Sequence, residues 1–168
     1  MHPYRSHHCA ELTPENIADT IRLSGWVHRK RDHGGVVFID LRDHYGLTQC
    51  VVDSTDPAFP AVETVRNESV ITVTGTVRAR SEETVNTALP TGGIEVHIDE
   101  LMIQSAADTL PIQVNSDEDS GEDIRLRYRY LDLRRQRPHD NIMLRSRIIQ
   151  SIRQRMLAQD FTEFQTPI

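Results

Sequence analysis

The 168-residue sequence has little cysteine and no long apolar run, and each shortage excludes a class of protein. Its two cysteines, Cys9 and Cys50, stand far apart and form no CxxC pair, so we expect neither a disulfide framework nor a metal site. No stretch approaches the ~20 apolar residues of a membrane span, and none resembles a signal sequence. These observations predict a reduced, cytoplasmic protein that binds no membrane.

Patterns that mark common active sites are missing as well. The sequence contains no GxxxxGK[ST] phosphate loop, no GxSxG nucleophile motif and no HExxH metal motif. Gly34 and Gly35 join two expected strands and no helix follows them, so a hairpin turn explains them better than a phosphate-binding loop. We therefore expect no catalytic residue, no complete active site and no cofactor within these residues.

Charge is strongly segregated along the chain. The net charge is −6, from 19 basic and 25 acidic residues, and Lys30 is the single lysine among the arginines. Residues 125–155 hold ten arginines, whereas residues 108–123 hold six carboxylates and no basic side chain. The net charge argues against a protein that coats nucleic acid non-specifically, but the segregation still allows a local basic surface.

Five stretches alternate apolar and polar residues and have the β-branched content of strands. They cover roughly residues 21–31, 34–43, 47–53, 69–80 and 93–103. A short helix is expected between the third and fourth stretches, with Asp56 as its cap and Pro57 at its first position. This order matches the five-stranded Greek-key barrel called the OB-fold, so the expected fold class is mainly β. Gly25 and Gly75 are expected at bulges.

The barrel is expected to occupy residues 1–103, followed by a linker and hinge over 104–140. The linker mixes proline, glycine, serine and acids without periodicity, and Pro138 closes the arginine- and tyrosine-rich hinge. A helix is expected from about residue 141 to residue 160. Residues 141–168 end in the alternating segment FTEFQTPI, where a further strand would begin, so we expect a fragment. The apolar stripe of the helix, which needs a partner surface, comprises Leu144, Ile148, Ile152 and Met156.

Aromatic, basic and amide side chains are expected together on the outer surface of the barrel. In the second strand Ile39 faces the core by alternation, so Phe38 faces outward. A strand phenylalanine is more often part of a core and exposed arginines are common, so the argument rests on the shared surface. OB-folds bind single-stranded nucleic acid on this surface. The candidate binding residues are Arg29, Arg31, Phe38, Gln49, Arg80 and Glu95.

Four segments carry a more specific signal. They are GWVHRKRDHGGVVFIDLRDHYGLTQCVV (25–52), RNESVITVTGTVRAR (66–80), TGGIEV (91–96) and, above all, RLRYRYLDLRR (125–135). Together they resemble the N-terminal part of bacterial aspartyl-tRNA synthetases, in order and over nearly the whole chain. The resemblance implies a class II aspartate–tRNA ligase that uses ATP and Mg²⁺ and binds the tRNA(Asp) anticodon through its barrel. The ATP and aspartate sites would lie beyond residue 168, so the fragment alone should be inactive.

The resemblance also implies a role for each candidate side chain. Phe38 would stack on the middle anticodon base, a uracil, and Gln49 would form hydrogen bonds with that base. Glu95 would read the first base, a guanine or its modified form, while Arg31 and Arg80 would lie near the third base, a cytosine. Arg29 would contact the backbone or a base. The chemistry fits, because unstacked loop bases are recognised by aromatic stacking and by hydrogen bonds to their edges.

Three further positions carry expectations from the same resemblance. The segment FTEFQTPI looks like class II motif 1, which ends at Pro167 and forms part of the homodimer interface in that family. His33 and Thr84 stand where members that are strictly specific for tRNA(Asp) often have leucine and asparagine. This combination is similar to members that charge both tRNA(Asp) and tRNA(Asn), so we hypothesise that the parent enzyme accepts both tRNAs.

Two other functions stay open from the residues alone. The chain could be a free-standing OB-fold module that binds single strands without sequence preference, which predicts equal binding to any anticodon loop. Alternatively, the barrel and helix could only support dimerisation, which an entirely monomeric fragment with anticodon preference would contradict. Under the main hypothesis the fragment should bind RNA weakly, because most phosphate contacts of a tRNA would lie on other parts of the parent enzyme.

Overall fold

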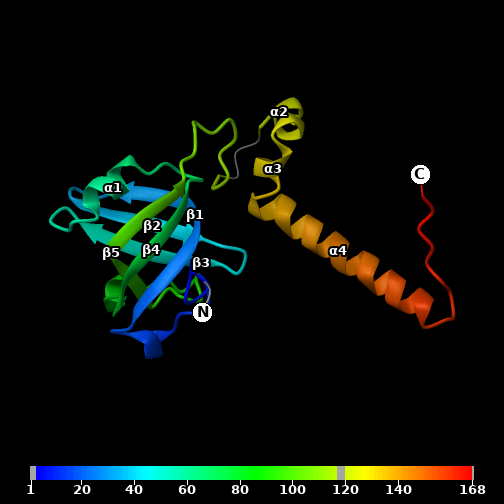
Figure 1. The fold of residues 1–168 in the computed structure, drawn as a ribbon, viewed down its shortest axis with the longest axis horizontal. Helices are drawn as coiled ribbons and strands as arrows, with labels where there is room; N and C mark the ends of the chain where they lie inside the picture. The colour runs from blue at the N-terminus through cyan, green and yellow to red at the C-terminus, as the bar shows by residue number, and fades with distance from the viewer. Residues whose placement is uncertain (1–2, 117–119, 168) are drawn as a thin grey trace. The chain divides into compact units, whose positions relative to one another are not determined.

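The computed structural model describes residues 3–116 and 120–167 (Figure 1). It divides into two compact units, Met1–Leu110 and Pro111–Ile168, which are described separately. Three of the six linker carboxylates, at 117–119, lie outside the described residues. No helix among the described residues is both long and apolar enough to cross a membrane.

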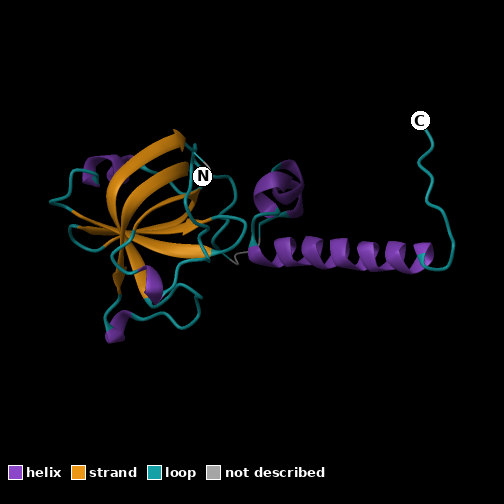
Figure 2. Cartoon of the chain, turned by 60° about the horizontal axis from the view of Figure 1, so that its bottom comes forward, coloured by secondary structure: helices purple, strands orange, loops and turns teal. Residues whose placement is uncertain are grey.

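The first unit is a closed five-stranded barrel, which confirms the expected OB-fold (Figures 1 and 2). Around the barrel the strands follow the order β1, β2, β3, β5, β4, and β4 returns to β1. All neighbours are antiparallel except β3 and β5, which are parallel. The strands are β1 (Thr20–Asp32), β2 (Val36–Arg42), β3 (Leu47–Asp53), β4 (Val70–Ala79) and β5 (Ile94–Ser105).

Alternation in β2 and at the start of β5 fills the barrel as the sequence predicts, whereas β3 is buried continuously from Thr48 to Val52. Val37, Ile39 and Leu41 of β2 are buried, and Phe38 between them is only half-buried. Ile94, Val96 and Ile98 do the same in β5. Ala79 is exposed, because β4 ends there, beyond its last buried residue, Val77. The other core residues of the strands are Ile21, Leu23, Val27, Thr48, Cys50, Val52, Ile71, Val73 and Val77.

The two strand glycines lie where backbones approach closely. At Gly75 the register of β4 and β5 shifts, as expected for a bulge, and an added Cβ would lie 2.2 Å from the His97 carbonyl oxygen. A Cβ added at Gly25 would lie equally close to the Arg42 carbonyl oxygen, but the register of β1 with its neighbours does not shift at Gly25. The irregularity of β1 falls instead between Val27 and Arg29. The expectation of a bulge at Gly25 was therefore wrong, and close packing explains this glycine.

The short helix α1 (Phe59–Thr64) lies between β3 and β4, as predicted, and contacts β2, β3 and β5. It begins two residues later than expected, so Pro57 precedes it. Asp56 does not cap the helix. Its carboxylate instead accepts a hydrogen bond from the Asp53 backbone, which tightens the turn after β3. Val62 is fully buried and anchors the helix on the barrel.

The segment before β1 packs into one end of the barrel. Cys9 and Leu12 are buried, and the Thr48 hydroxyl donates a hydrogen bond to the Cys9 carbonyl. Thr13 then caps the 3₁₀ turn η1 (Pro14–Asn16). Cys9 and Cys50 are free thiols, and burial raises the pKa of both well above the ordinary range. Both thiols are therefore protonated and act as small apolar core residues.

Arg42 joins β2 to β1 and to the turn before β4. Its Nη2 donates to both carboxylate oxygens of Glu68, at 2.8 and 3.0 Å, and its Nη1 donates to His28 Nδ1 at 2.8 Å. The guanidinium also lies 5.9 Å from the centre of the Trp26 ring. Burial first, and then the positive charge of Arg42, lower the pKa of His28 below its ordinary value. The neutral imidazole can therefore accept this hydrogen bond.

The second unit is helical and differs more from expectation. The expected hinge forms two short helices, α2 (Glu122–Arg127) and α3 (Arg129–Asp132). The long helix α4 spans Gln136–Leu157, so it begins earlier than expected. Pro138 lies inside its first turn, where the missing N–H has no helical acceptor to lose. Residues 161–167 form no strand, because none of the described residues pairs with them.

Candidate functional site

A bulge in β1 decides which side chains reach the outer surface of the barrel. Before it, Val27 is buried and lies opposite the buried Leu41. After it, Lys30 lies opposite the buried Ile39, and Arg31 lies opposite Phe38. Strict alternation from Val27 would have turned Arg31 toward the core. The extra residue reverses the phase, and Arg29 and Arg31 therefore share a face with Phe38.

Phe38 is the aromatic centre of this face. Its ring centroid lies 5.9 Å from the Arg31 guanidinium carbon and 5.6 Å from the His33 ring, which meets it edge-on at 78°. His33 comes from the hairpin turn between β1 and β2, where Gly34 and Gly35 both have positive φ. The half-buried ring therefore has two neighbouring side chains, and an aromatic ring on such a surface can stack a base.

Gln49 lies beside the ring but is more buried than the sequence indicates, with 6% of its surface exposed. Its Oε1 accepts a hydrogen bond from Arg31 Nη2 at 3.3 Å, and its Nε2 donates to Glu95 Oε2 at 3.1 Å. The other Glu95 partner is Arg80, whose Nε lies 4.0 Å from Oε2. A continuous polar chain therefore crosses the barrel face from β1 through β3 and β5 to the end of β4.

The structure brings five of the six candidate residues into this connected group. Arg31, Phe38, Gln49, Glu95 and Arg80 are joined by the contacts above, whereas the exposed Arg29 shares their face by its strand phase. Nε of Arg31 and Nε of Arg80 are buried, and no hydrogen-bond acceptor for either exists among the described residues. Both Nε–H groups are enclosed behind the surface, whose accessible parts include the Arg31 side chain, 39% exposed, and the half-buried Phe38 ring.

One residue of this surface was missed from the sequence, and one basic neighbour lies off the surface. Asp40 Oδ1 accepts a hydrogen bond from Arg31 Nη2 at 2.7 Å. Its strand phase, which is that of Phe38, was a sufficient signal to place it there. Lys30 turns away from the surface and donates to the Val62 and Glu63 carbonyls at the end of α1, and desolvation lowers its pKa. The shift in phase made Lys30 unpredictable.

The remaining two candidates lie apart from the connected group. Thr84 belongs to the 3₁₀ turn η2 (Glu82–Thr84), and its hydroxyl donates to the Ser81 carbonyl at 3.1 Å. Pro167 lies in the irregular segment of the second unit. Among the described residues no group of three histidine, cysteine or carboxylate side chains could hold a metal ion.

The second unit has its own basic cluster around a buried carboxylate. Asp132 is fully buried and accepts hydrogen bonds from Arg125 Nε at 3.1 Å and Arg129 Nη1 at 2.5 Å. Arg135 Nη1 lies 3.7 Å from it. These three arginines and Arg137 line a cavity of about 790 Å³ at the start of α4. Four guanidinium groups therefore line this cavity, and their positive charge attracts anions.

Family comparisons match both units. Residues 21–104 match the family described as OB-fold nucleic acid binding domain, and residues 121–168 match the class II tRNA synthetases for D, K and N.

Curated relatives cover the whole chain. The aspartate–tRNA(Asp/Asn) ligase of Erythrobacter litoralis is 60% identical over all 168 residues, which make up 28% of that protein. The corresponding ligase of Paramagnetospirillum magneticum is 61% identical, and the chain spans 19% of it. The chain thus spans less than a third of the length of these relatives.

A solved structure has a similar fold. The asparaginyl-tRNA synthetase of Pyrococcus horikoshii, in complex with asparaginyl-adenylate, aligns with a TM-score of 0.79 and 27% identity. The alignment covers 96% of this chain and 36% of that one.

Proposed function

We propose, from the premise that this chain belongs to the family of OB-fold nucleic acid binding domains, that its barrel reads a tRNA anticodon for an aspartate–tRNA ligase. One observation carries the proposal: Arg31, Phe38, Gln49, Glu95 and Arg80 form one connected group on the outer face of the barrel. A stacking ring, an amide and guanidinium groups are the kinds of side chain that recognise unstacked loop bases.

The roles proposed for the site follow this geometry. Phe38 stacks on the middle base, a uracil, and Gln49 bonds the edge of the same base. Glu95 reads the guanine at the first position. Arg31, which contacts Phe38 and Gln49, and Arg80, which lies near Glu95, contact the third base, a cytosine. Arg29, which is exposed on the same face, contacts the RNA backbone.

The parent enzyme is proposed to be a cytoplasmic homodimer that activates aspartate with ATP and Mg²⁺ and transfers it to tRNA(Asp). Residues 1–103 are its anticodon-binding domain, residues 104–140 its hinge, and residues 141–168 the start of its catalytic domain. The match of residues 121–168 to class II tRNA synthetases supports this division. The exposed apolar stripe of α4 and the segment ending at Pro167 are proposed to belong to the dimer interface.

The most direct test replaces the proposed stacking ring. Phe38→Ala should weaken binding to a GUC anticodon stem-loop by ~1–3 kcal/mol, because base stacking on an aromatic ring contributes about that much. The free energy of unfolding should change little, since the ring is only half-buried. Fluorescence anisotropy with labelled stem-loops and denaturant unfolding would measure the two quantities on the same protein.

Tyr45→Ala is the matched control, because Tyr45 is an exposed aromatic residue of the hairpin between β2 and β3, outside the connected group. It should leave RNA affinity unchanged. A loss of ~3–5 kcal/mol in stability for Phe38→Ala would show a core residue instead. Equal binding of the unmodified chain to GUC and unrelated loops would favour a non-specific single-strand module over anticodon recognition.

Acceptance of tRNA(Asn) is a finer part of the proposal. The edge contact between His33 and Phe38 supports it, because a residue that touches the stacking ring can influence which loops are held there. The curated relatives, whose names include both tRNA(Asp) and tRNA(Asn), support it as well. Charging assays with the full-length parent should give product on both tRNAs. Absence of product on tRNA(Asn) would refute dual acceptance and leave anticodon binding untouched.

A further inference from the structure

The amide of Gln49 can adopt only one orientation in this site. A guanidinium has donors and no acceptor, and a carboxylate has acceptors and no donor. Because Arg31 bonds one end of the amide and Glu95 bonds the other, Oε1 must face Arg31 and Nε2 must face Glu95. Rotating the amide by half a turn would oppose two donors at Arg31 and two acceptors at Glu95. The chemistry of its neighbours therefore fixes the amide.

Asp40 holds Arg31, one of the two residues that fix the orientation of the Gln49 amide. Its Oδ1 lies 2.7 Å from Arg31 Nη2, the same nitrogen that bonds Gln49, and this is the shorter of the two contacts. The Arg31 side chain is 39% exposed, whereas that of Asp40 is 18% exposed. Without the carboxylate the long, exposed side chain could turn into solvent and release Oε1. Asp40 thus acts on Gln49 through Arg31.

A fixed amide distinguishes uracil from cytosine. Their edges carry opposite groups at position 4, an acceptor oxygen in uracil and a donor amino group in cytosine, and opposite groups at N3. An amide set to bond one of these edges must rotate by half a turn to bond the other when the ring stays stacked in place. The constraint from both neighbours opposes that rotation.

We propose that Asp40 is a positioning residue that, through Arg31, sets the Gln49 amide for uracil and against cytosine at the middle anticodon position. The proposal rests on the proposed function, since it deepens the selectivity of the same site. It concerns selectivity between two pyrimidines more than affinity, because Asp40 itself bears a negative charge on an RNA-binding surface and contributes no attraction to phosphate.

The test compares two stem-loops that differ in one base, GUC and GCC, on the 168-residue chain. The measured quantity is the dissociation constant for the GCC loop divided by that for the GUC loop, which is the selectivity for uracil. Asp40→Ala should lower this ratio about fivefold, the factor represented by one ordinary hydrogen bond. Asp40→Asn keeps an oxygen acceptor for Arg31 without the charge, so it should lower the ratio by about twofold. If Asp40→Ala does not fold, Asp40→Asn provides the measurement.

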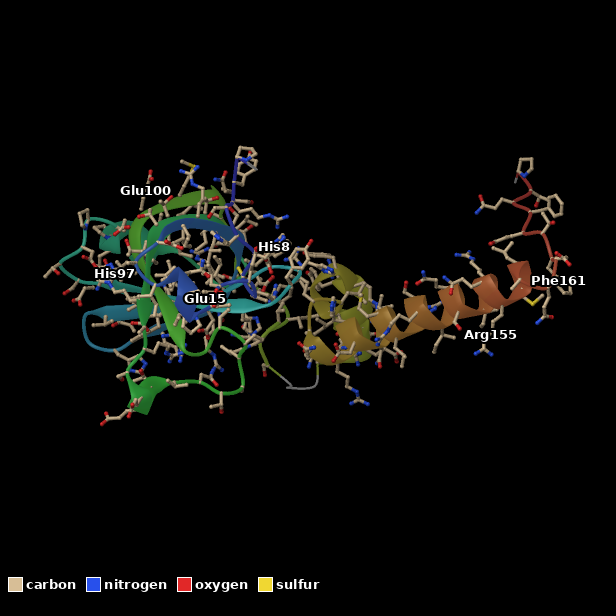
Figure 3. The ribbon with its side chains drawn as sticks, turned by 90° about the horizontal axis from the view of Figure 1, so that it is seen from below. His8, Glu15, His97, Glu100, Arg155 and Phe161 are labelled. Carbon is tan, nitrogen blue, oxygen red and sulfur yellow. The ribbon has the colours of Figure 1, made fainter. Side chains whose placement is uncertain are left out.

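Glu100→Ala is the matched control for charge. Glu100 is an exposed carboxylate on β5 of the same barrel (Figure 3), so its removal changes the net charge as Asp40→Ala does. It should alter both affinities equally and leave the ratio unchanged.

The outcomes separate the two proposals. An unchanged ratio in Asp40→Ala, or an equal change in affinity for both loops, would overturn the role of Asp40 while anticodon reading stands. If the unmodified chain itself binds GUC and GCC loops equally, anticodon reading fails and the role of Asp40 fails with it. A ratio that falls in Asp40→Ala and is largely restored in Asp40→Asn supports both.

Discussion

The barrel and the helical unit use apolar residues in opposite ways. The barrel buries its apolar rows in one closed core, whereas α4 has no buried residue, and its stripe from Leu144 to Met156 is exposed. In Figure 3 the labelled Arg155 lies on α4 and Phe161 follows it, both within the helical unit. The barrel therefore has the means to fold by itself, while most of the stability of α4 must come from surfaces that would cover its stripe.

The largest expected effect tests this difference with one substitution in each region. Ile39→Ala removes a fully buried side chain of the barrel and should lower the free energy of unfolding by ~2–5 kcal/mol. Ile148→Ala removes the same atoms from a residue of α4 that is 51% exposed. It should change the free energy of unfolding by less than ~0.5 kcal/mol. Urea unfolding followed by the fluorescence of Trp26 and by circular dichroism would measure both. Similar losses in the two variants would contradict the contrast.

A second substitution addresses the one tightly held part of the helical unit. Asp132→Asn keeps the shape of a fully buried side chain but removes the charge that holds Arg125 and Arg129. The helices around it should lose ~1.5–3 kcal/mol, the usual contribution of a hydrogen bond to a charged group. Hydrogen exchange should speed up over residues 122–135 and stay unchanged in the barrel strands. Faster exchange throughout the barrel would show that the units depend on each other.

The smallest expected effect is a pH dependence confined to the barrel. His28 has a lowered pKa in the folded chain, so near pH 6 the unfolded chain binds a proton that the folded chain does not. Stability from this group is present above the ordinary pKa of about 6.5 and falls as the pH drops below it. Between pH 7.5 and 5.5 the free energy of unfolding should therefore decrease. His28→Gln, which can still accept from Arg42, should show a smaller loss over the same range, and an identical pH profile would refute the assignment.

Alternation and turn residues were sufficient to predict the barrel. The five strands and the outward phase of Phe38 follow from period-two patterns, because a strand with one face in the core alternates apolar and polar residues. The helix between β3 and β4 was expected from turn and capping residues instead. The bulge after Val27 could not be predicted, since no residue in that stretch requires it. It moved Lys30 away from the surface and brought Arg31 to it. The pattern thus identified the right surface, and tertiary pairing decided which basic residues occupy it.

The helical unit was harder to predict for a different reason. The segment 122–132 has neither a long apolar period nor a side-chain cap, and its two short helices depend on the contacts of Asp132 with arginines. Pro138 was interpreted as a boundary because proline usually ends helices, yet it is also tolerated within the first turn. Side-chain contacts that determine local structure leave little periodic signal in a sequence. The same holds for Asp40, whose position was predictable but whose bond to Arg31 was not.

The parallel pairing that closes the barrel has a consequence for how such a site can change. β3 and β5 are joined by two residue pairs, Cys50 with Val96 and Val51 with His97, so this is a narrow seam in the cylinder. The bond from Gln49 to Glu95 crosses the seam one residue before these pairs. The side chains proposed to read RNA therefore also hold β3 and β5 together. A substitution at Glu95 that alters base preference should also weaken the contact between β3 and β5. Evolution of a new base specificity at this position would therefore need a compensating contact elsewhere along β3.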